Sequence, residues 1–177
     1  MLEDFLRKLY SFLSNHQIEE LGPNEENPGI PELGTDALKS LCSKIIEERA
    51  RRVSLVVTDK TRPTPLKPIV NPMVKFLEEK NVKVEIVFAT GTHEMTLEEA
   101  SDMLGGRPGN AGIHVHDCIK DEHDHLGETP GGVSVEVLDK TLSADAAVLI
   151  GTVMPHPWAG FSGGSKLLLP ASPAGAL

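Results

Sequence analysis

The sequence predicts an α/β fold: a three-layer domain with a mostly parallel central sheet flanked by helices, Rossmann-like in type. Short β-branched apolar runs alternate with amphipathic helical segments along the chain. Each run ends in a polar or glycine-containing loop that leads into the next helix. This order is typical of βαβ units, whose parallel strands present their carboxyl ends at one edge of the sheet.

Four apolar runs are expected to form the sheet. They start at Val53, Val82, Ile113 and Ala146, and a hairpin-like excursion is expected near Val133. The intervening helices are predicted from apolar residues at helical spacing. Thr35 is predicted to cap the first of these helices, Pro65 or Pro68 to open the second, and Thr96 to Glu99 to form a capping box for the third.

The chain is expected to divide near residue 34. Residues 1–34 contain an amphipathic helix at about 2–14, followed by a linker rich in proline and glycine. Residues 35–177 are expected to form the α/β domain. The linker marks the boundary because it lacks any apolar periodicity.

Composition excludes several classes of protein. The 177 residues are 40% hydrophobic and 24% charged, which is typical of a globular domain. The formal net charge of −9 opposes nucleic acid and anionic membranes as partners. Two cysteines far apart make a disulfide framework unexpected, and no apolar run approaches the roughly 20 residues that span a bilayer. A cytoplasmic location is expected, and the oligomeric state is left open.

The C-terminal loop after the Ala146 strand contains a histidine, closely spaced glycines and a lysine, Lys166. Glycines near a lysine suggest a phosphate loop, but Lys166 is followed by Leu167 instead of the serine or threonine that would ligate magnesium. A surface loop with a solvated lysine is the plainer alternative. His156 and the sole tryptophan, Trp158, favour a functional loop.

Two earlier loops follow strands in the same way. The first carries Asp59, Thr61 and Arg62, and the second carries His93. Arg62 could bind a carboxylate through two hydrogen bonds, whereas the alternative is an Asp59–Arg62 pair that only fixes the turn. His93 could be an acid/base group, and the alternative is a solvated surface histidine.

Histidines and carboxylates are dense between His114 and His125, which raises a metal site as a further hypothesis. The segment lacks the His-x-x-x-His spacing of a catalytic zinc site and has no cysteine pair. A solvated acidic loop is therefore the preferred interpretation, and no metal ligand is assigned.

Three motifs in order carry a family resemblance. They are Asp59-Lys60-Thr61-Arg62-Pro63, Ala89-Thr90-Gly91-Thr92-His93 and His156-x-x-x-Gly160-Phe161-Ser162-Gly163-Gly164-x-Lys166. Together they resemble the N-terminal domain of the lactate racemase family over roughly residues 50 to 170. Residues 1–34 lie outside the resemblance.

The resemblance implies racemisation or epimerisation of a small 2-hydroxy acid with a nickel-pincer nucleotide as cofactor. It makes His93 and His156 the two acid/base residues, Arg62 the carboxylate-binding residue and Lys166 the covalent attachment point of the cofactor. The expected cofactor-binding residues are Lys166, Asp59, Thr61, Ser162, Gly163 and Gly164. This set agrees with the chemistry of a hydroxy acid, which needs a cationic fork, two bases near neutral pKa and a hydride acceptor that no side chain supplies.

The chain also departs from the family pattern. The family's nickel-ligating histidine and its second domain would lie beyond Leu177, so the chain resembles a fragment, without a loaded cofactor and inactive alone. Ala171 stands where glycine is usual, and Glu94 stands where a basic residue is frequent, which favours a substrate other than lactate. A non-catalytic module that binds a nucleotide or anion, and the metal-binding protein, remain as alternatives.

Overall fold

A computed structural model describes residues 34–129, 132, 134–156 and 160–169. Gly34–Leu177 forms one compact unit, and the account below concerns that unit. The predicted helix at 2–14 and its linker lie outside the described residues. The strands are β1 (Arg52–Thr58), β2 (Lys83–Ala89), β3 (Gly112–Val115), β4 (His123–Glu128), β5 (Ser134–Leu138), β6 (Ala146–Ile150), β7 (Pro155–His156) and β8 (Gly160–Phe161). The helices are α2 (Thr35–Glu47), α3 (Leu66–Glu79), α4 (Leu97–Leu104), α5 (Asp139–Leu142) and the 3₁₀ helix η1 (Gly164–Leu167).

A four-stranded sheet with the order β3-β2-β1-β6 forms the centre of the unit, and all three of its pairings are parallel. β1 is mostly apolar and is buried from Val53 to Thr58, as expected for a central strand covered on both faces. The predicted α/β fold with a parallel sheet flanked by helices is therefore confirmed. The four predicted strands all exist, each within about one residue of its expected start.

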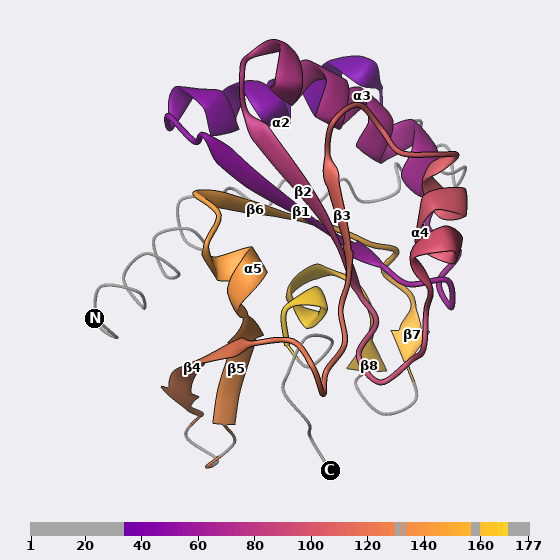
Figure 1. Ribbon diagram of the computed structural model, residues 1–177, viewed down its shortest axis with the longest axis vertical. Coiled ribbons are helices and arrows are strands. Elements are labelled where there is room, and N and C mark those ends of the chain that lie inside the picture. The colour runs from indigo at the N-terminus through magenta and orange to yellow at the C-terminus, as the bar shows by residue number, and fades with distance from the viewer. Residues whose placement is uncertain (1–33, 130–131, 133, 157–159, 170–177) are drawn as a thin grey trace, which may run out of the picture. The chain divides into compact units, whose positions relative to one another are not determined.

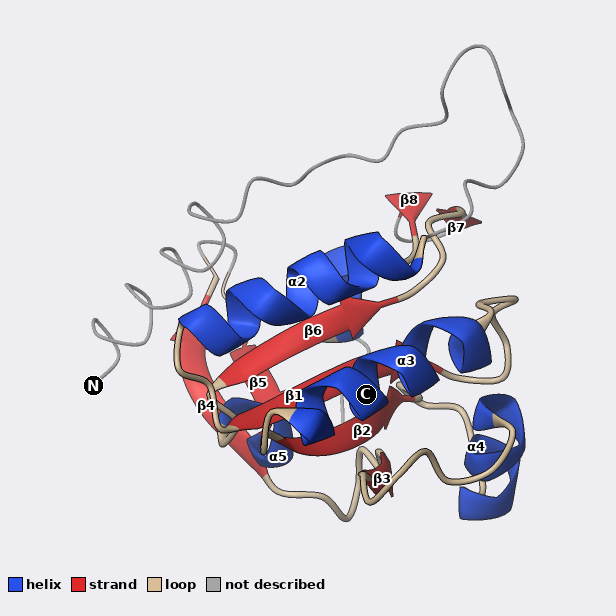
Figure 2. Ribbon diagram, turned by 90° about the horizontal axis from the view of Figure 1, so that it is seen from above, coloured by secondary structure: helices blue, strands red, loops and turns tan. Residues whose placement is uncertain are grey.

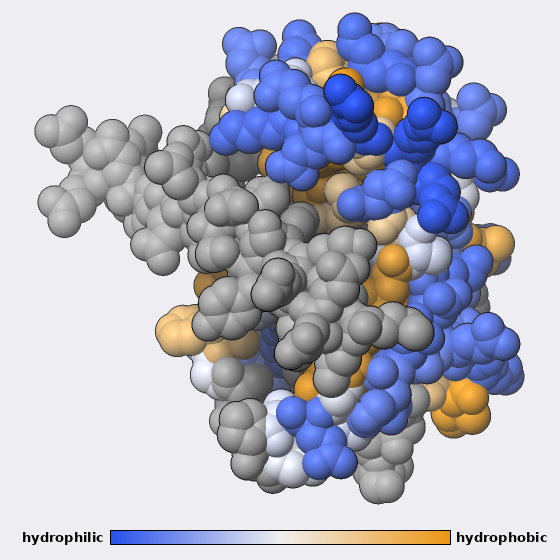
Figure 3. Space-filling view, turned by 90° about the vertical axis from the view of Figure 1, so that its left-hand side faces the viewer, coloured by the Kyte–Doolittle hydropathy of each residue, from blue (hydrophilic) through white to orange (hydrophobic). Residues whose placement is uncertain are grey.

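One face of the sheet is covered by α2, α3 and α4 (Figures 1 and 2). Alternate residues of the strands, among them Leu55, Ile86 and Phe88, are fully buried against the apolar stripes of these helices. The outward sides of the helices are polar, and Figure 3 shows hydrophilic side chains over the upper part of the face that it draws. Amphipathic helices on a parallel sheet thus make the main core.

On the opposite face, the described residues form only short elements. η1 and α5 lie there, and Val56, Ala89 and Leu167 form a small apolar cluster between the sheet and η1 (Figure 1). This cluster attaches the last described segment to the middle of the sheet. The position of Lys166, one residue before buried Leu167, is fixed by that attachment.

A separate antiparallel hairpin pairs β4 with β5, which confirms the expected excursion near Val133. Its first strand was not predicted, because His123–Glu128 is polar and lacks alternation between apolar and polar residues. The pairing also shifts register between His125 and Gly127. The interpretation of the whole 117–125 segment as a solvated loop is therefore wrong, since His123 and His125 belong to a strand.

The N-termini of α2 and α4 can be compared with the predicted helix caps. The Thr96 hydroxyl accepts from the Glu99 amide at 3.2 Å, and the Glu99 carboxylate accepts from the Thr96 amide at 2.8 Å, so the predicted capping box of α4 is present. The predicted cap of α2 is wrong. Gly34 holds the N-cap position and Thr35 is already helical, because a helix can start at glycine without a side-chain cap.

In the described part of the chain, helices are all too short or too polar to cross a bilayer.

We expect replacement of Phe88 by alanine to lower the free energy of unfolding by about 3–5 kcal/mol, because this side chain is fully buried and its loss leaves a cavity. Chemical denaturation of the chain measures the effect. Leu97→Ala is the matched control, since Leu97 is 59% exposed and should change stability by less than about 0.5 kcal/mol. Equal effects of the two variants would contradict this description of the core.

Candidate functional site

Three loops meet at the carboxyl edge of the sheet. They follow β1, β2 and β6 and carry Arg62, His93 and His156 respectively. Since β1 lies between β2 and β6, its loop lies between the other two, at the same end of the sheet (Figure 1). Open parallel sheets bind ligands at this edge, so the topology brings the predicted site residues into one region.

His93 is held by a buried carboxylate. Its Nδ1 lies 2.6 Å from Oδ2 of Asp59, whose side chain is 6% exposed, whereas the His93 side chain is 53% exposed. An ionised carboxylate can only accept, so Nδ1 carries the proton and donates it. In the neutral ring, Nε2 then keeps its lone pair, and this arrangement makes His93 a candidate base.

Asp59 is itself held by its own loop. Its Oδ1 accepts from the Thr61 amide at 3.0 Å and from the Thr61 hydroxyl at 2.6 Å. The carboxylate therefore has three hydrogen-bond donors, which allows its charge to lie in a buried place. The sequence suggested an Asp59–Arg62 pair as the alternative to binding, but the contacts of the Asp59 carboxylate are with His93 and Thr61.

Positive charge gathers on the loop after β6. Partial burial lowers the pKa of His156, and the positive charges of Lys166 and Arg62 lower it further. Partial burial likewise lowers the pKa of Lys166, and Arg62 adds to the effect. Such electrostatic effects fall off with distance, so Arg62 and Lys166 lie near enough to His156 to act on it. Both shifts lower the pKa, so the charged form of each group is less favoured than in an isolated side chain.

The glycine-containing loop is shaped by its backbone. The Ser162 hydroxyl is directed to the carbonyls of Thr152 and Met154, at 3.0 and 3.3 Å. Gly163 has a φ of +82°, and a Cβ there would lie 3.0 Å from the Thr152 carbonyl oxygen, so a side chain would be both strained and crowded. A Cβ on Gly164 would meet nothing within 4 Å, which leaves open space beside Lys166.

Three threonines that sequence reasoning missed join the loops after β1 and β6. Thr58 donates its hydroxyl to Thr64 at 3.0 Å, and the hydroxyls of Thr64 and Thr152 lie 2.8 Å apart. The only sequence signal was that each threonine stands at the carboxyl end of a strand or in the loop that follows it. Hydroxyl contacts over 88 positions have no signature in a single sequence.

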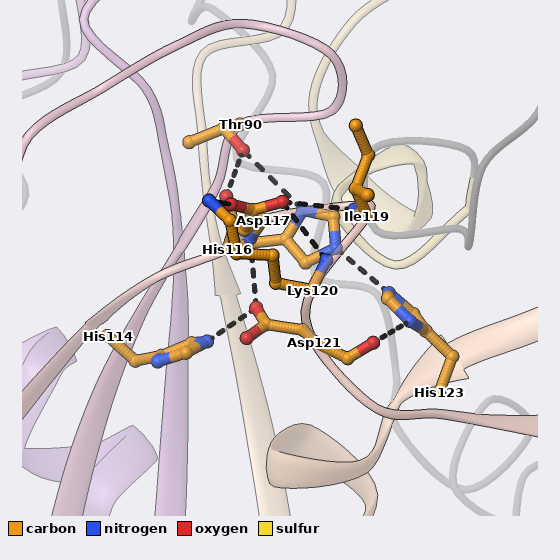
Figure 4. Close-up of polar contacts among 8 residues, drawn as sticks. All are labelled: Thr90, His114, His116, Asp117, Ile119, Lys120, Asp121 and His123. Atoms are coloured by element: carbon orange, nitrogen blue, oxygen red, sulfur yellow. Dashed lines mark hydrogen bonds and ion pairs between the residues drawn. The ribbon is translucent and has the colours of Figure 1, made fainter.

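The segment rich in histidine and aspartate, from His114 to His125, contains a turn that is held by hydrogen bonds beside β2 (Figure 4). His116 is 3% exposed, and its Nε2 lies 2.9 Å from Nε2 of His123. The Thr90 hydroxyl donates to the His116 carbonyl at 2.7 Å, and Asp121 accepts from His114 at 2.7 Å. The turn thus joins the hairpin to the sheet.

The geometry of the His116 and His123 rings suits one hydrogen bond between their Nε2 atoms. The ring centroids are 5.2 Å apart and the two Nε2 atoms are 2.9 Å apart. The difference is about two ring radii, so each Nε2 lies on the line between the centroids and points at the other. A zinc ion in line between two imidazoles would need the nitrogens about 4 Å apart, and a bent site would need lone pairs that converge. Among the described residues, no group of three or more potential ligands could hold a metal ion. The metal hypothesis for this segment is not supported.

The comparisons with known proteins agree with the fold and the loop order. The family model described as lactate racemase N-terminal domain matches residues 33–175. The chain belongs to this family. It is 33% identical over 150 residues to a lactate racemase from Thermoanaerobacterium thermosaccharolyticum, covering 82% of the chain and 33% of that protein. A lactate racemase from Lactiplantibacillus plantarum is 30% identical over 133 residues, covering 71% of the chain and 31% of that protein.

A solved structure has a similar fold. The structure of the lactate racemase apoprotein from T. thermosaccharolyticum matches with a TM-score of 0.62 and 27% identity, over 77% of the chain and 37% of that chain. The present chain thus spans about a third of the length of the relatives it matches.

A hollow of about 670 Å³ lies at the other, amino-terminal edge of the sheet. Charges of both signs line it, among them Arg52, Lys83, Lys140, Glu78 and Glu85. Since the loops after the strands lie at the opposite edge, the hollow is separate from the candidate site.

We expect the domain to lose stability as the pH falls below about 6.5, because burial and the neighbouring His123 lower the pKa of His116 to about 4. The unfolded chain binds this proton below its ordinary pKa of about 6.5, whereas the folded chain does not bind it until about pH 4. The loss at pH 5 should be on the order of 2 kcal/mol. Denaturant titrations of the wild type and His116→Gln at pH 7 and 5 measure it. An unchanged pH dependence in the variant would contradict the assignment.

Proposed function

We propose that the chain is the N-terminal domain of a 2-hydroxy-acid racemase or epimerase. One observation carries the proposal: the loop after β1 holds His93 through Asp59 while Arg62, three residues later, acts electrostatically on His156 and Lys166. The chemically capable side chains of three separate loops therefore share one edge. Family membership and the relatives named lactate racemase support the same reaction class.

Each side chain has a role that its surroundings favour. Arg62 binds the substrate carboxylate, because guanidinium presents paired donors to two oxygens. His93 and His156 move the hydroxyl proton, one for each enantiomer, because inversion requires a base on either side of the reacting carbon. Asp59 is a positioning residue that sets the His93 tautomer. The lowered pKa of His156 keeps it in the basic form near neutral pH.

The residues present fit the cofactor that the family implies. Lys166 is a half-buried amine with a lowered pKa, beside open space above Gly164. A nickel-pincer nucleotide attached there would supply the hydride acceptor that side chains lack. The site of this group would be lined by Gly163, Gly164, Ser162, Thr61 and Asp59. The last three would act by holding the loop backbone and the Asp59 carboxylate in position.

A further domain is proposed to complete the site. The chain matches about a third of the length of its relatives, and the loops at the carboxyl edge leave the His93 side chain 53% exposed. A site open to water cannot strengthen electrostatic contacts or protect a reactive hydride. The chain alone is therefore expected to be inactive, with the nickel-ligating histidine supplied from outside it.

We expect the full-length protein to racemise an enantiopure 2-hydroxy acid such as lactate. Replacement of His93 or His156 by asparagine should lower kcat by about 10²-fold or more, because each removes an acid/base group. Chiral analysis of the product measures the rate. His125→Asn is the matched control, since this histidine lies on the exposed hairpin.

The covalent state of Lys166 separates the enzyme from a module that binds a nucleotide or anion without catalysis. Intact mass of the full-length protein should show an adduct that Lys166→Ala lacks. Reversible nucleotide binding without an adduct or turnover would favour the module instead.

Asp59→Asn should lower kcat of the full-length enzyme by about 10- to 100-fold, with little change in KM. The amide can donate to Nδ1 and so favours the wrong tautomer of His93. Thr61→Val is the graded control, because it removes one of the three donors and leaves the backbone amide in place. A pH–rate profile separates the cases, and an Asp59→Asn enzyme with wild-type kcat would remove this role from Asp59.

A further inference from the structure

The hydroxyl of Thr64 is the centre of the contact between the loops after β1 and β6. It accepts from the Thr58 hydroxyl at 3.0 Å and from the Thr152 amide at 3.2 Å, and it lies 2.8 Å from the Thr152 hydroxyl. Thr58 and Thr64 are 4% and 9% exposed, so water is largely excluded from this contact.

Counting lone pairs fixes the direction of the last bond. A hydroxyl oxygen has two lone pairs and one proton. Thr58 and the Thr152 amide occupy both lone pairs of Thr64, so Thr64 must donate its proton to the Thr152 oxygen. The Thr152 hydroxyl therefore accepts here, and its own proton is left for another acceptor.

The surroundings of Thr152 indicate which groups its hydroxyl proton can reach. Thr152 is half-buried and lies two residues after β6. Its amide and hydroxyl contact Thr64, which is two residues from Arg62, while its carbonyl accepts from Ser162 and lies against Gly163. Within the described ranges, no acceptor for the Thr152 hydroxyl proton is found.

We propose that the Thr152 hydroxyl donates this proton to an anionic oxygen of the ligand that Arg62 holds. Arg62 and Lys166 make this region positive, and a neutral donor between their loops adds a charge-assisted hydrogen bond without adding to the repulsion. The anionic oxygen belongs to a carboxylate or a phosphate. This inference rests on the proposed function for the identity of the ligand, but its geometry does not.

The test uses calorimetric titration of the full-length protein with oxalate, and separately with inorganic phosphate. Thr152→Val should weaken binding of one of these anions by about 10-fold or more, and Thr152→Ser should bind as the wild type does. Thr64→Val is the matched control, because it breaks the same contact between loops but keeps the Thr152 hydroxyl. The anion that responds identifies the source of the oxygen.

Equal weakening by Thr64→Val and Thr152→Val would overturn the inference, since the effect would then be structural. Thr152→Ala repeats the measurement if the valine variant does not fold. Absence of racemisation together with Thr152-dependent anion binding would refute the proposed function and leave this inference standing. Absence of any binding that depends on Arg62 would refute the inference whatever the activity.

Discussion

Parallel pairing of β1 with both β2 and β6 is the constraint on which the candidate site depends. Parallel strands end at one edge, and the central strand places its loop within reach of both neighbours. Within that loop, the Asp59 side chain contacts His93 on the β2 side and the Thr64 side chain contacts Thr152 on the β6 side. Packing of the apolar strands against α2 and α3 therefore sets the positions of side chains that make no apolar contact themselves.

The buried groups at this edge show how polar chemistry is placed on an apolar sheet. Asp59 is buried but has three donors, and the Thr64 hydroxyl uses all of its bonding capacity. A half-satisfied group in either place would destabilise the fold, because desolvation without a partner is costly. Because these hydrogen bonds fix the Asp59 and Thr64 side chains, each loop is held in one geometry. This rigidity suits a site that must hold a small substrate.

Much of the fold was readable from the sequence because the signals were local. The run at Val53 is rich in valine and mostly apolar, and the Thr96 capping box involves residues three apart. β4 was missed because its polar residues are ordered by pairing with β5, and Thr35 was misplaced because Gly34 starts the helix without a side-chain bond. Loop order alone predicted that Arg62 and His93 share an edge.

The particular contacts of the site were not readable. Asp59 and His93 are 34 positions apart, and Thr64 and Thr152 are 88 apart, so only the folded sheet brings them together. Short polar side chains at strand ends are also common without any function, and sequence cannot tell which of them will meet. The family motifs name residues in three loops, but the hydrogen bonds within and between these loops form only in the folded chain.

Arg62 and Lys166, near His156, give an acidic protein a local positive patch. The chain has a formal charge of −9, yet these side chains act on one another at the edge where a small anion would enter. Field lines from such a patch draw anions toward it and the surrounding negative surface repels them elsewhere, so diffusional encounters are guided to one place. If the proposed function holds, capture of a carboxylate is fastest in dilute salt and slows as ions screen the patch, independently of how tightly the site holds its ligand.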